Sequence, residues 1–180
     1  MKTAADVLKF WFIDHGPVDW FAGKPEFDAE IAADFAETHA AVARGEGWDW
    51  RSTPEGRLAE VIVLDQFSRQ LHRNDPRAFM SDRMALALAQ EAVGGGHHHF
   101  LPPERRVFML MPFMHSESRA MQAESVRLFT ALGIENNLKF ARAHADVIAR
   151  FGRFPKRNAA LGRTSTPEEV QYLASGEAAF

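Results

Sequence analysis

The sequence predicts an all-α protein. Apolar residues recur with the 3.6-residue period of helices, as in Phe27, Ile31, Phe35 and Val42. Helix-start signals also recur, in which Ser or Thr precedes a Pro or an acidic first turn. No segment shows the convincing alternation of a half-buried strand, because the apolar run 61–64 lies inside a long helical segment.

The start signals can be followed along the chain. Thr3 with Asp6 resembles a capping box, and Thr53 and Thr166 each stand before a Pro at a first helical position. We expect about eight helices, packed as antiparallel hairpins because their connections are short. Residues 152–165 are expected to form an ordered loop and residues 175–180 a frayed tail. The predicted helices are 3–14, 26–44, 54–73, 77–93, 103–111, 116–132, 136–151 and 167–174.

Bulk properties narrow the class of protein. A chain of 180 residues with 46% apolar residues, fifteen Phe and four Trp predicts a single domain over 1–180 and excludes a disordered chain. The net charge of −3 argues against nucleic-acid binding. No apolar run approaches the roughly 18 residues of a membrane span, and no signal peptide is recognisable, so a cytoplasmic location without a membrane role is expected. The chain has no Cys, which excludes disulfides and thiolate chemistry.

The helix at 54–73 carries an acidic residue on its apolar stripe. Asp65 continues the line of Leu58 and Ile62, and Arg69 lies four residues further on the same face. A buried carboxylate needs a partner, and Arg69 is the obvious one. Two interpretations stay open, a structural ion pair between helices or a catalytic Asp65 that orients or activates a ligand while Arg69 binds it.

A second group of candidates lies at 111–117. Pro112 disfavours continuation of the preceding helix, so Ser116 is a plausible N-cap, with Glu117 in the first turn. His115 stands just before that start, where it can act as a general base or ligand. The alternative is a buried, hydrogen-bonded structural histidine. We place His115 among catalytic candidates and Glu117 among ligand-binding ones.

The predicted helix 136–151 and the loop after it supply the remaining candidates. His144 lies on the stripe of Phe140 and Val147, and is either a satisfied core residue or a catalytic group. Between Asp146 and Glu168 there are five basic residues and no acid, with aromatics interleaved. This segment leads into a helix start and is typical of a site for carboxylate or phosphate. Its alternative role is to pair with acids in a structural network. The candidate ligand-binding residues are Arg150, Arg153, Asn158 and Arg163.

We expect no metal and no cofactor, with a metal site built from His115, Glu117, His144 and Asp65 as the less favoured alternative. The triplet at 97–99 consists of consecutive histidines, whereas metal sites on helices use residues three or four apart. We expect the methionine-rich stripe that includes Met84, Met109 and Met111 to pack in the hydrophobic core.

Five separated strings also resemble the signature blocks of a bacterial family known as domain of unknown function 924. This resemblance implies an all-α fold with helix pairs arranged like tetratricopeptide repeats in a right-handed superhelix, and it implies no particular activity. The family pattern usually has Pro at Ser68, Asn at Gln70 and His at Lys156, so this chain lacks one imidazole in the basic loop. The strings are VLKFWF (7–12), LDQFSR (64–69), FMHSE (113–117), RFGRFPKRN (150–158) and LGRTSTPEE (161–169).

Three functions therefore stay open. The favoured one is a small anionic-ligand-binding protein or enzyme with a buried Asp/His/Arg pocket, in which Arg150, Arg153 and Arg163 clamp the anion. The second is a tetratricopeptide-like module that binds a peptide or a partner protein. The third is a purely structural network of charges between helices.

Overall fold

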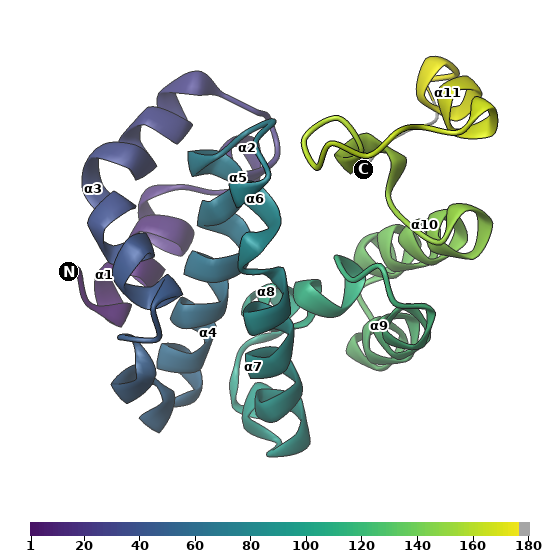
Figure 1. Cartoon of the computed structure of the whole chain (residues 1–180). Helices are drawn as coiled ribbons and strands as arrows, with labels where there is room; N and C mark the ends of the chain where they lie inside the picture. The colour runs from purple at the N-terminus through teal and green to yellow at the C-terminus, as the bar shows by residue number, and fades with distance from the viewer. Residues whose placement is uncertain (177–180) are drawn as a thin grey trace. The chain divides into compact units, whose positions relative to one another are not determined.

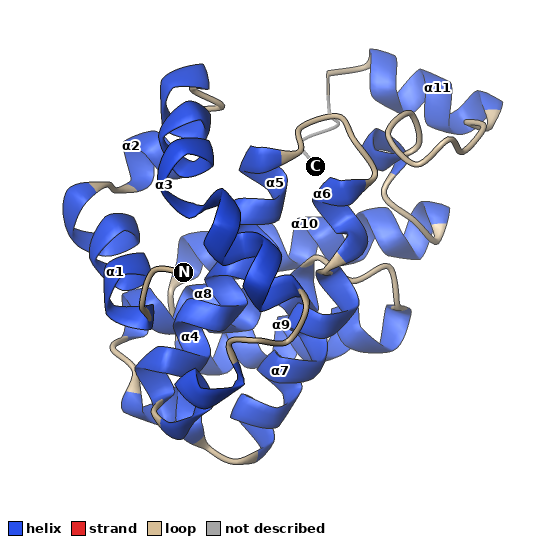
Figure 2. Ribbon diagram, turned by 60° about the vertical axis from the view of Figure 1, so that its left-hand side comes forward, coloured by secondary structure: helices blue, strands red, loops and turns tan. Residues whose placement is uncertain are grey.

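The computed structural model describes residues 1–176, and every regular element in that range is a helix, with no strand (Figure 2). The all-α prediction is confirmed. The chain divides into two compact units. Unit 1 comprises Met1–Arg73 and Arg77–Pro112, and unit 2 comprises Asn74–Pro76 and the chain from Phe113 onwards. The expected single domain stays a prediction, since the division into units does not test whether they fold separately.

Unit 1 contains the elements up to α8 (Figure 1). The predicted helices at 3–14, 26–44 and 54–73 are all present, with ends within two residues of their predicted positions. The structure adds short helices in predicted connections and splits the helix predicted at 77–93. The elements are α1 (Ala4–Lys9), η1 (Phe10–Asp14), α2 (Pro17–Trp20), α3 (Pro25–Ala43), η2 (Trp48–Ser52), α4 (Pro54–Ile62), η3 (Val63–Phe67), α5 (Ser68–Leu71), α6 (Arg77–Met80), α7 (Asp82–Gly94), η4 (His97–Phe100) and α8 (Pro103–Met114), which crosses the boundary.

Two π-helical turns, η1 and η3, lie inside helical runs of unit 1. A π turn inserts an extra residue and so rotates the apolar face of the helix that follows it. The two turns supply the aromatic centre of the unit. The rings of Phe10 and Phe67 meet edge to face at 6.0 Å, and Trp11 contacts Phe67 at 5.7 Å and Phe108 at 5.6 Å.

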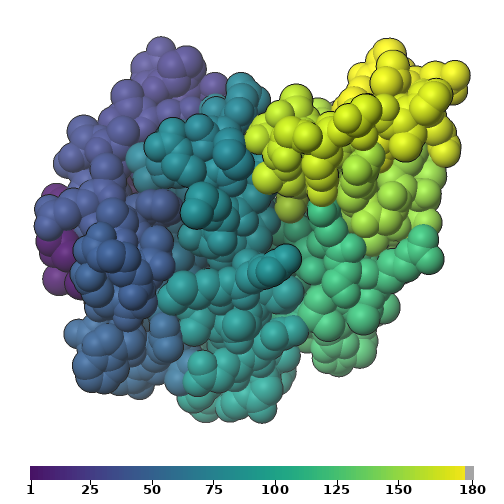
Figure 3. Space-filling view, viewed as in Figure 1, coloured from purple at the N-terminus to yellow at the C-terminus, as the bar shows by residue number. Residues whose placement is uncertain are grey.

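Unit 2 is built on the hairpin of α9 (Arg119–Leu132) and α10 (Glu135–Phe151). Gly133, at φ 78°, ends α9 in the left-handed conformation that glycine adopts without strain. A loop with the short helix η5 (Pro155–Arg157) leads to α11 (Pro167–Ala174). Tyr172 of α11 packs with Val147, Ile148 and Phe154, so α11 lies against α10 (Figures 1 and 3).

The predicted caps at Thr3 and Thr166 are confirmed. Each side chain accepts a hydrogen bond from the third residue of its helix, and the acid there accepts one from the cap's N–H in return. Thr53 likewise caps α4 by accepting from the backbone N–H of Gly56.

The predicted boundary around Pro112 is wrong. Helix α8 runs through Pro112 to Met114, so the loss of the one hydrogen bond that Pro112 cannot donate does not end the helix. Helix α9 then starts at Arg119 with Ser118 as N-cap, so Ser116 does not cap it and Glu117 precedes the first turn. The Ser116 hydroxyl instead accepts a bond from the N–H of Ser118. The predicted tail at 175–180 lies mostly outside the described residues.

In the part of the chain that the structure describes, no helix combines the length and the apolarity needed to cross a membrane. This agrees with the absence of a long apolar run in the sequence.

A buried histidine links α3 to α5 in unit 1. His39 Nε2 lies 2.8 Å from Ser68 Oγ, and the Ser68 hydroxyl donates to Leu64 O at 2.6 Å. Because the Ser68 hydroxyl uses its proton in the bond to Leu64 O, it can only accept from His39. Nε2 of His39 therefore carries a proton and donates it to Ser68 Oγ. Burial, together with the nearby ring of His72, lowers the pKa of His39 from 6.5 to about 4.

His39 should therefore make the protein sensitive to acid. Below pH 6.5 the unfolded chain takes up a proton on this residue, whereas the folded chain does so only near pH 4, so stability is lost as the pH falls through this window. The loss is on the order of 3 kcal/mol over the window. Urea unfolding from pH 7 to pH 4 should show a shallower loss for His39→Gln than for the unsubstituted protein. The exposed His99→Gln is the control, and equal slopes in all three proteins would contradict the prediction.

Candidate functional site

The predicted pair of Asp65 and Arg69 forms in unit 1. Asp65 is 1% exposed, and its Oδ1 lies 3.2 Å from Arg69 Nη1. Arg69 also donates to both carboxylate oxygens of Asp82, at 3.0 and 3.1 Å, which joins η3 and α5 to α7. Burial opposes the charge of Arg69, but Asp65 and Asp82 outweigh it and raise its pKa. Gln66 Nε2 donates to Asp65 Oδ2 at 2.6 Å. Asp65 is thus part of a network of ion pairs and hydrogen bonds in unit 1.

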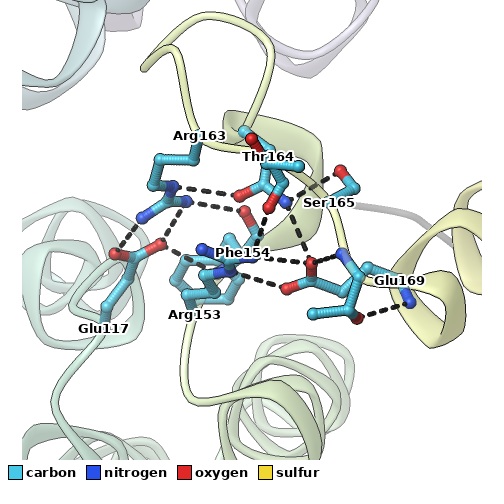
Figure 4. Close-up of polar contacts among 9 residues, drawn as sticks. Glu117, Arg153, Phe154, Arg163, Thr164, Ser165 and Glu169 are labelled. Carbon is cyan, nitrogen blue, oxygen red and sulfur yellow. Dashed lines mark hydrogen bonds and ion pairs between the residues drawn. The ribbon is translucent and has the colours of Figure 1, made fainter.

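Glu117 is the centre of the polar network of unit 2 (Figure 4). Its two carboxylate oxygens accept from Arg163 Nη1 and Nη2, at 2.8 and 2.9 Å. The backbone N–H of Phe154 donates to the same carboxylate at 2.8 Å. Partial burial favours the neutral acid, but these bonds outweigh it and lower the pKa of Glu117. One side chain ahead of α9 therefore holds both ends of the basic loop.

Glu169 forms a second centre at the start of α11. Arg153 donates to its two oxygens at 2.6 and 2.7 Å, and Thr166 N–H donates to it at 2.7 Å. These hydrogen bonds, that of Arg153 foremost, lower the pKa of Glu169 to about 2. Asn158 joins the two centres, since its side chain donates to Glu169 at 3.3 Å and accepts from Arg163 Nε at 2.9 Å.

The structure thus brings four predicted ligand-binding residues of unit 2 into one network. Glu117, Arg153, Asn158 and Arg163 bind one another or Glu169. Arg150 pairs with Glu168 at 2.8 Å, where both side chains are about half exposed. Each of the three arginines predicted to clamp an anion is therefore matched to a glutamate.

The two predicted histidines of unit 2 lie together, with ring centroids 6.1 Å apart. His144 is 7% exposed, as its position on the apolar stripe predicted, although Phe140 on the same stripe is 45% exposed. His144 Nδ1 lies 2.8 Å from Phe140 O, and because a carbonyl only accepts, Nδ1 carries a proton. In the neutral ring Nε2 is then the atom that can accept a proton. The ring also meets Phe154 edge to face at 5.5 Å.

Arg157 and Gln122 also belong to this region, although neither was among the predicted site residues. Arg157 Nη2 donates to His115 O at 2.9 Å, and its guanidinium lies 4.5 Å from the centre of the Phe154 ring. Gln122 Nε2 donates to the carbonyls of Met114 and Ser116, on either side of His115. The interleaving of arginines and aromatics was a usable signal for Arg157, whereas nothing in the sequence marks Gln122.

No group of three or more His, Asp or Glu side chains in residues 1–176 is arranged to hold a metal ion. Imidazole nitrogens can donate or accept protons, and guanidinium groups donate hydrogen bonds to anionic groups.

The family model that describes a bacterial protein of unknown function (DUF924) matches residues 7–177. The chain belongs to this family. A solved structure of a protein of unknown function, ATU0120 from Agrobacterium tumefaciens, shares 39% sequence identity with it and has a TM-score of 0.91. The match covers 96% of this chain and 97% of that chain. Among curated proteins, none matches this chain. The family predicted from the five strings is confirmed.

The Glu169 centre can be tested as a brace. Glu169→Gln removes the charge that holds Arg153 while preserving the shape of the side chain, and we expect it to lower the free energy of unfolding by about 2 kcal/mol. The neighbouring Glu168→Gln is the matched control, because exposed ion pairs contribute little. Urea unfolding measures both. Equal stability of the two variants would show that the network does not hold the loop.

Proposed function

We propose that the chain binds a small anion, as a ligand-binding protein or an enzyme, at the pair of His115 and His144 in unit 2. The observation that carries the proposal is the fixed ring of His144. Its Nδ1 is bound to Phe140 O, its ring meets that of Phe154 edge to face, and His115 lies beside it. Catalytic and ligand-binding histidines are oriented in the same way, by a hydrogen bond at the nitrogen that does not react.

Local charge supports an anionic ligand. Loop residues 150–163 contain five cations, of which Glu117, Glu168 and Glu169 bind three directly. Arg157 lies next to His115 through its bond to the backbone carbonyl, so a guanidinium is close to the histidine pair. Carboxylates and phosphates are the ligands that Arg and His groups favour.

In this proposal the two kinds of residue have different roles. Arg153, Arg163, Glu117, Glu169 and Asn158 hold the loop, since their hydrogen bonds are directed at one another. His115, His144 and Arg157 bind the ligand, and either imidazole can act as a general acid or base when the ligand reacts. The Asp65–Arg69–Asp82 network belongs to unit 1 and is assigned a bracing role there.

The proposal predicts that anion binding depends on the histidines. With inorganic phosphate and acetate as probes, His144→Asn and His115→Asn should each weaken binding at least about tenfold in isothermal titration calorimetry. His99→Asn, an exposed histidine of unit 1, should bind as the unsubstituted protein does. Circular dichroism checks that the variants are folded. If neither anion binds, or if folded variants bind as tightly as the parent, the proposal is overturned.

A second candidate function is peptide binding by a tetratricopeptide-like helical hairpin. A groove along α10 is lined mainly by charged and polar side chains, which can pair with the charges of a bound peptide. Its lining residues are Glu135, Asn136, Lys139, Arg142, Ala143 and Asp146.

This second function predicts a different set of sensitive residues. The double variant Lys139→Ala, Arg142→Ala should lose binding to acidic peptides on an array, because both cations of the groove are removed. Arg127→Ala, on the exposed face of α9 and paired with Glu124, is the control. Peptide binding that is equal in both variants would exclude the groove as the binding surface.

A further inference from the structure

Two polar side chains of α9 are buried without a full set of hydrogen bonds. Gln122 is 2% exposed and Ser125 is 0% exposed. The amide nitrogen of Gln122 donates to two carbonyls, but its Oε1 and the hydroxyl of Ser125 have no hydrogen-bond partner in residues 1–176. A buried polar atom that stays unpaired is unfavourable and rare in native proteins. These two atoms therefore indicate a position where polar partners are required.

The two side chains lie on one face of α9. Residues three apart on a helix are neighbours, with Cβ atoms about 5–6 Å from each other. Gln122 Oε1 can only accept a hydrogen bond, whereas the Ser125 hydroxyl can donate or accept one. A single small group placed between them can satisfy both.

Along the axis of the α9–α10 hairpin, this face of α9 lies close to the position of His144. Helices α9 and α10 form an antiparallel hairpin that turns at Gly133. Gln122 and His144 are equally distant from that glycine along the chain, so they lie at the same height of the hairpin. Gln122 is also fixed to the backbone on both sides of His115. Gln122 thus lies at the level of the two histidines, and Ser125 lies about one turn of α9 closer to Gly133.

We infer that the ligand of this site is a small anion that also carries a hydroxyl group, such as a hydroxy acid or a hydroxyalkyl phosphate. This inference rests on the proposed function. The anionic end binds at the imidazoles and Arg157. The hydroxyl donates to Gln122 Oε1 and accepts from the Ser125 hydroxyl. A hydroxyl is the simplest group that does both, whereas an ammonium group only donates and a carbonyl only accepts.

The test compares anions of equal size that differ in this one group. Glycolate is measured against propionate, in which a methyl replaces the hydroxyl, and 2-hydroxyethyl phosphate against propyl phosphate. Isothermal titration calorimetry on the full chain should show about tenfold tighter binding of the hydroxylated member, because a site with paired polar groups rejects the analogue that lacks the hydroxyl. The two pairs distinguish a carboxylate from a phosphate as the anionic group.

Ser125→Ala assigns the preference to these two side chains of α9. It removes an unpaired hydroxyl without removing any protein hydrogen bond, so the variant should fold at least as stably as the parent. Its preference for the hydroxylated anion should fall to threefold or less. Thr130→Ala removes an exposed hydroxyl of α9, bonded to Val126 O, and should keep the full preference.

The outcomes separate the two proposals. Anions that bind equally with and without the hydroxyl, or a preference that Ser125→Ala leaves intact, would overturn the hydroxyl inference while the anion site stands. That result would assign the unpaired atoms to bound water. Absence of binding by every anion would overturn the anion site itself, and the hydroxyl inference with it.

Discussion

The organisation of unit 2 depends on the carboxylate of Glu117. It lies ahead of α9, yet it binds the backbone N–H of Phe154 and the guanidinium of Arg163, which come from opposite ends of the loop after α10. The same guanidinium donates to Phe154 O, so one acid and one arginine fix both polar groups of that residue. Phe154 in turn packs against the His144 ring. A contact between distant parts of the sequence therefore sets the position of the loop and the surroundings of the histidines together.

The ionic networks brace the units because each arginine makes several bonds in fixed directions. Removing one partner of a buried pair leaves a charge without compensation, which costs more than the intact pair contributes. Unit 1 has a further example in Glu60 of α4. Its buried carboxylate accepts from both Nε and Nη2 of Arg51. Charges used in this way determine how loops and helices are aligned. They also account for most of the basic residues that suggested an anion site from sequence alone.

The sequence predicts most of the fold because local physics determines it. Period and capping locate the long helices, and the capping boxes at Thr3 and Thr166 form as expected. Local rules fail at Pro112, where a helix tolerates proline near its end, and at the π turns, whose extra residue leaves no mark in the pattern. The predicted site stays a prediction, and the partners of its residues lie too far along the chain to be inferred from the sequence. Glu117 and Arg163 have no local signal that pairs them, and Gln122 has no signal at all.

The contrast between satisfied and unsatisfied groups in unit 2 bears most directly on function. Glu117, Arg163, Asn158 and Glu169 use their hydrogen-bonding atoms on one another or on the backbone, and so hold the loop. In the α9–α10 hairpin, the buried Ser125 hydroxyl and Gln122 Oε1 have no hydrogen-bond partner among residues 1–176. An alanine at position 125 would avoid the cost of burying an unpaired hydroxyl, and it would remove only one oxygen atom from the packing. In the proposed anion site, a bound molecule would supply the hydrogen-bond partners that these two atoms of α9 lack within residues 1–176.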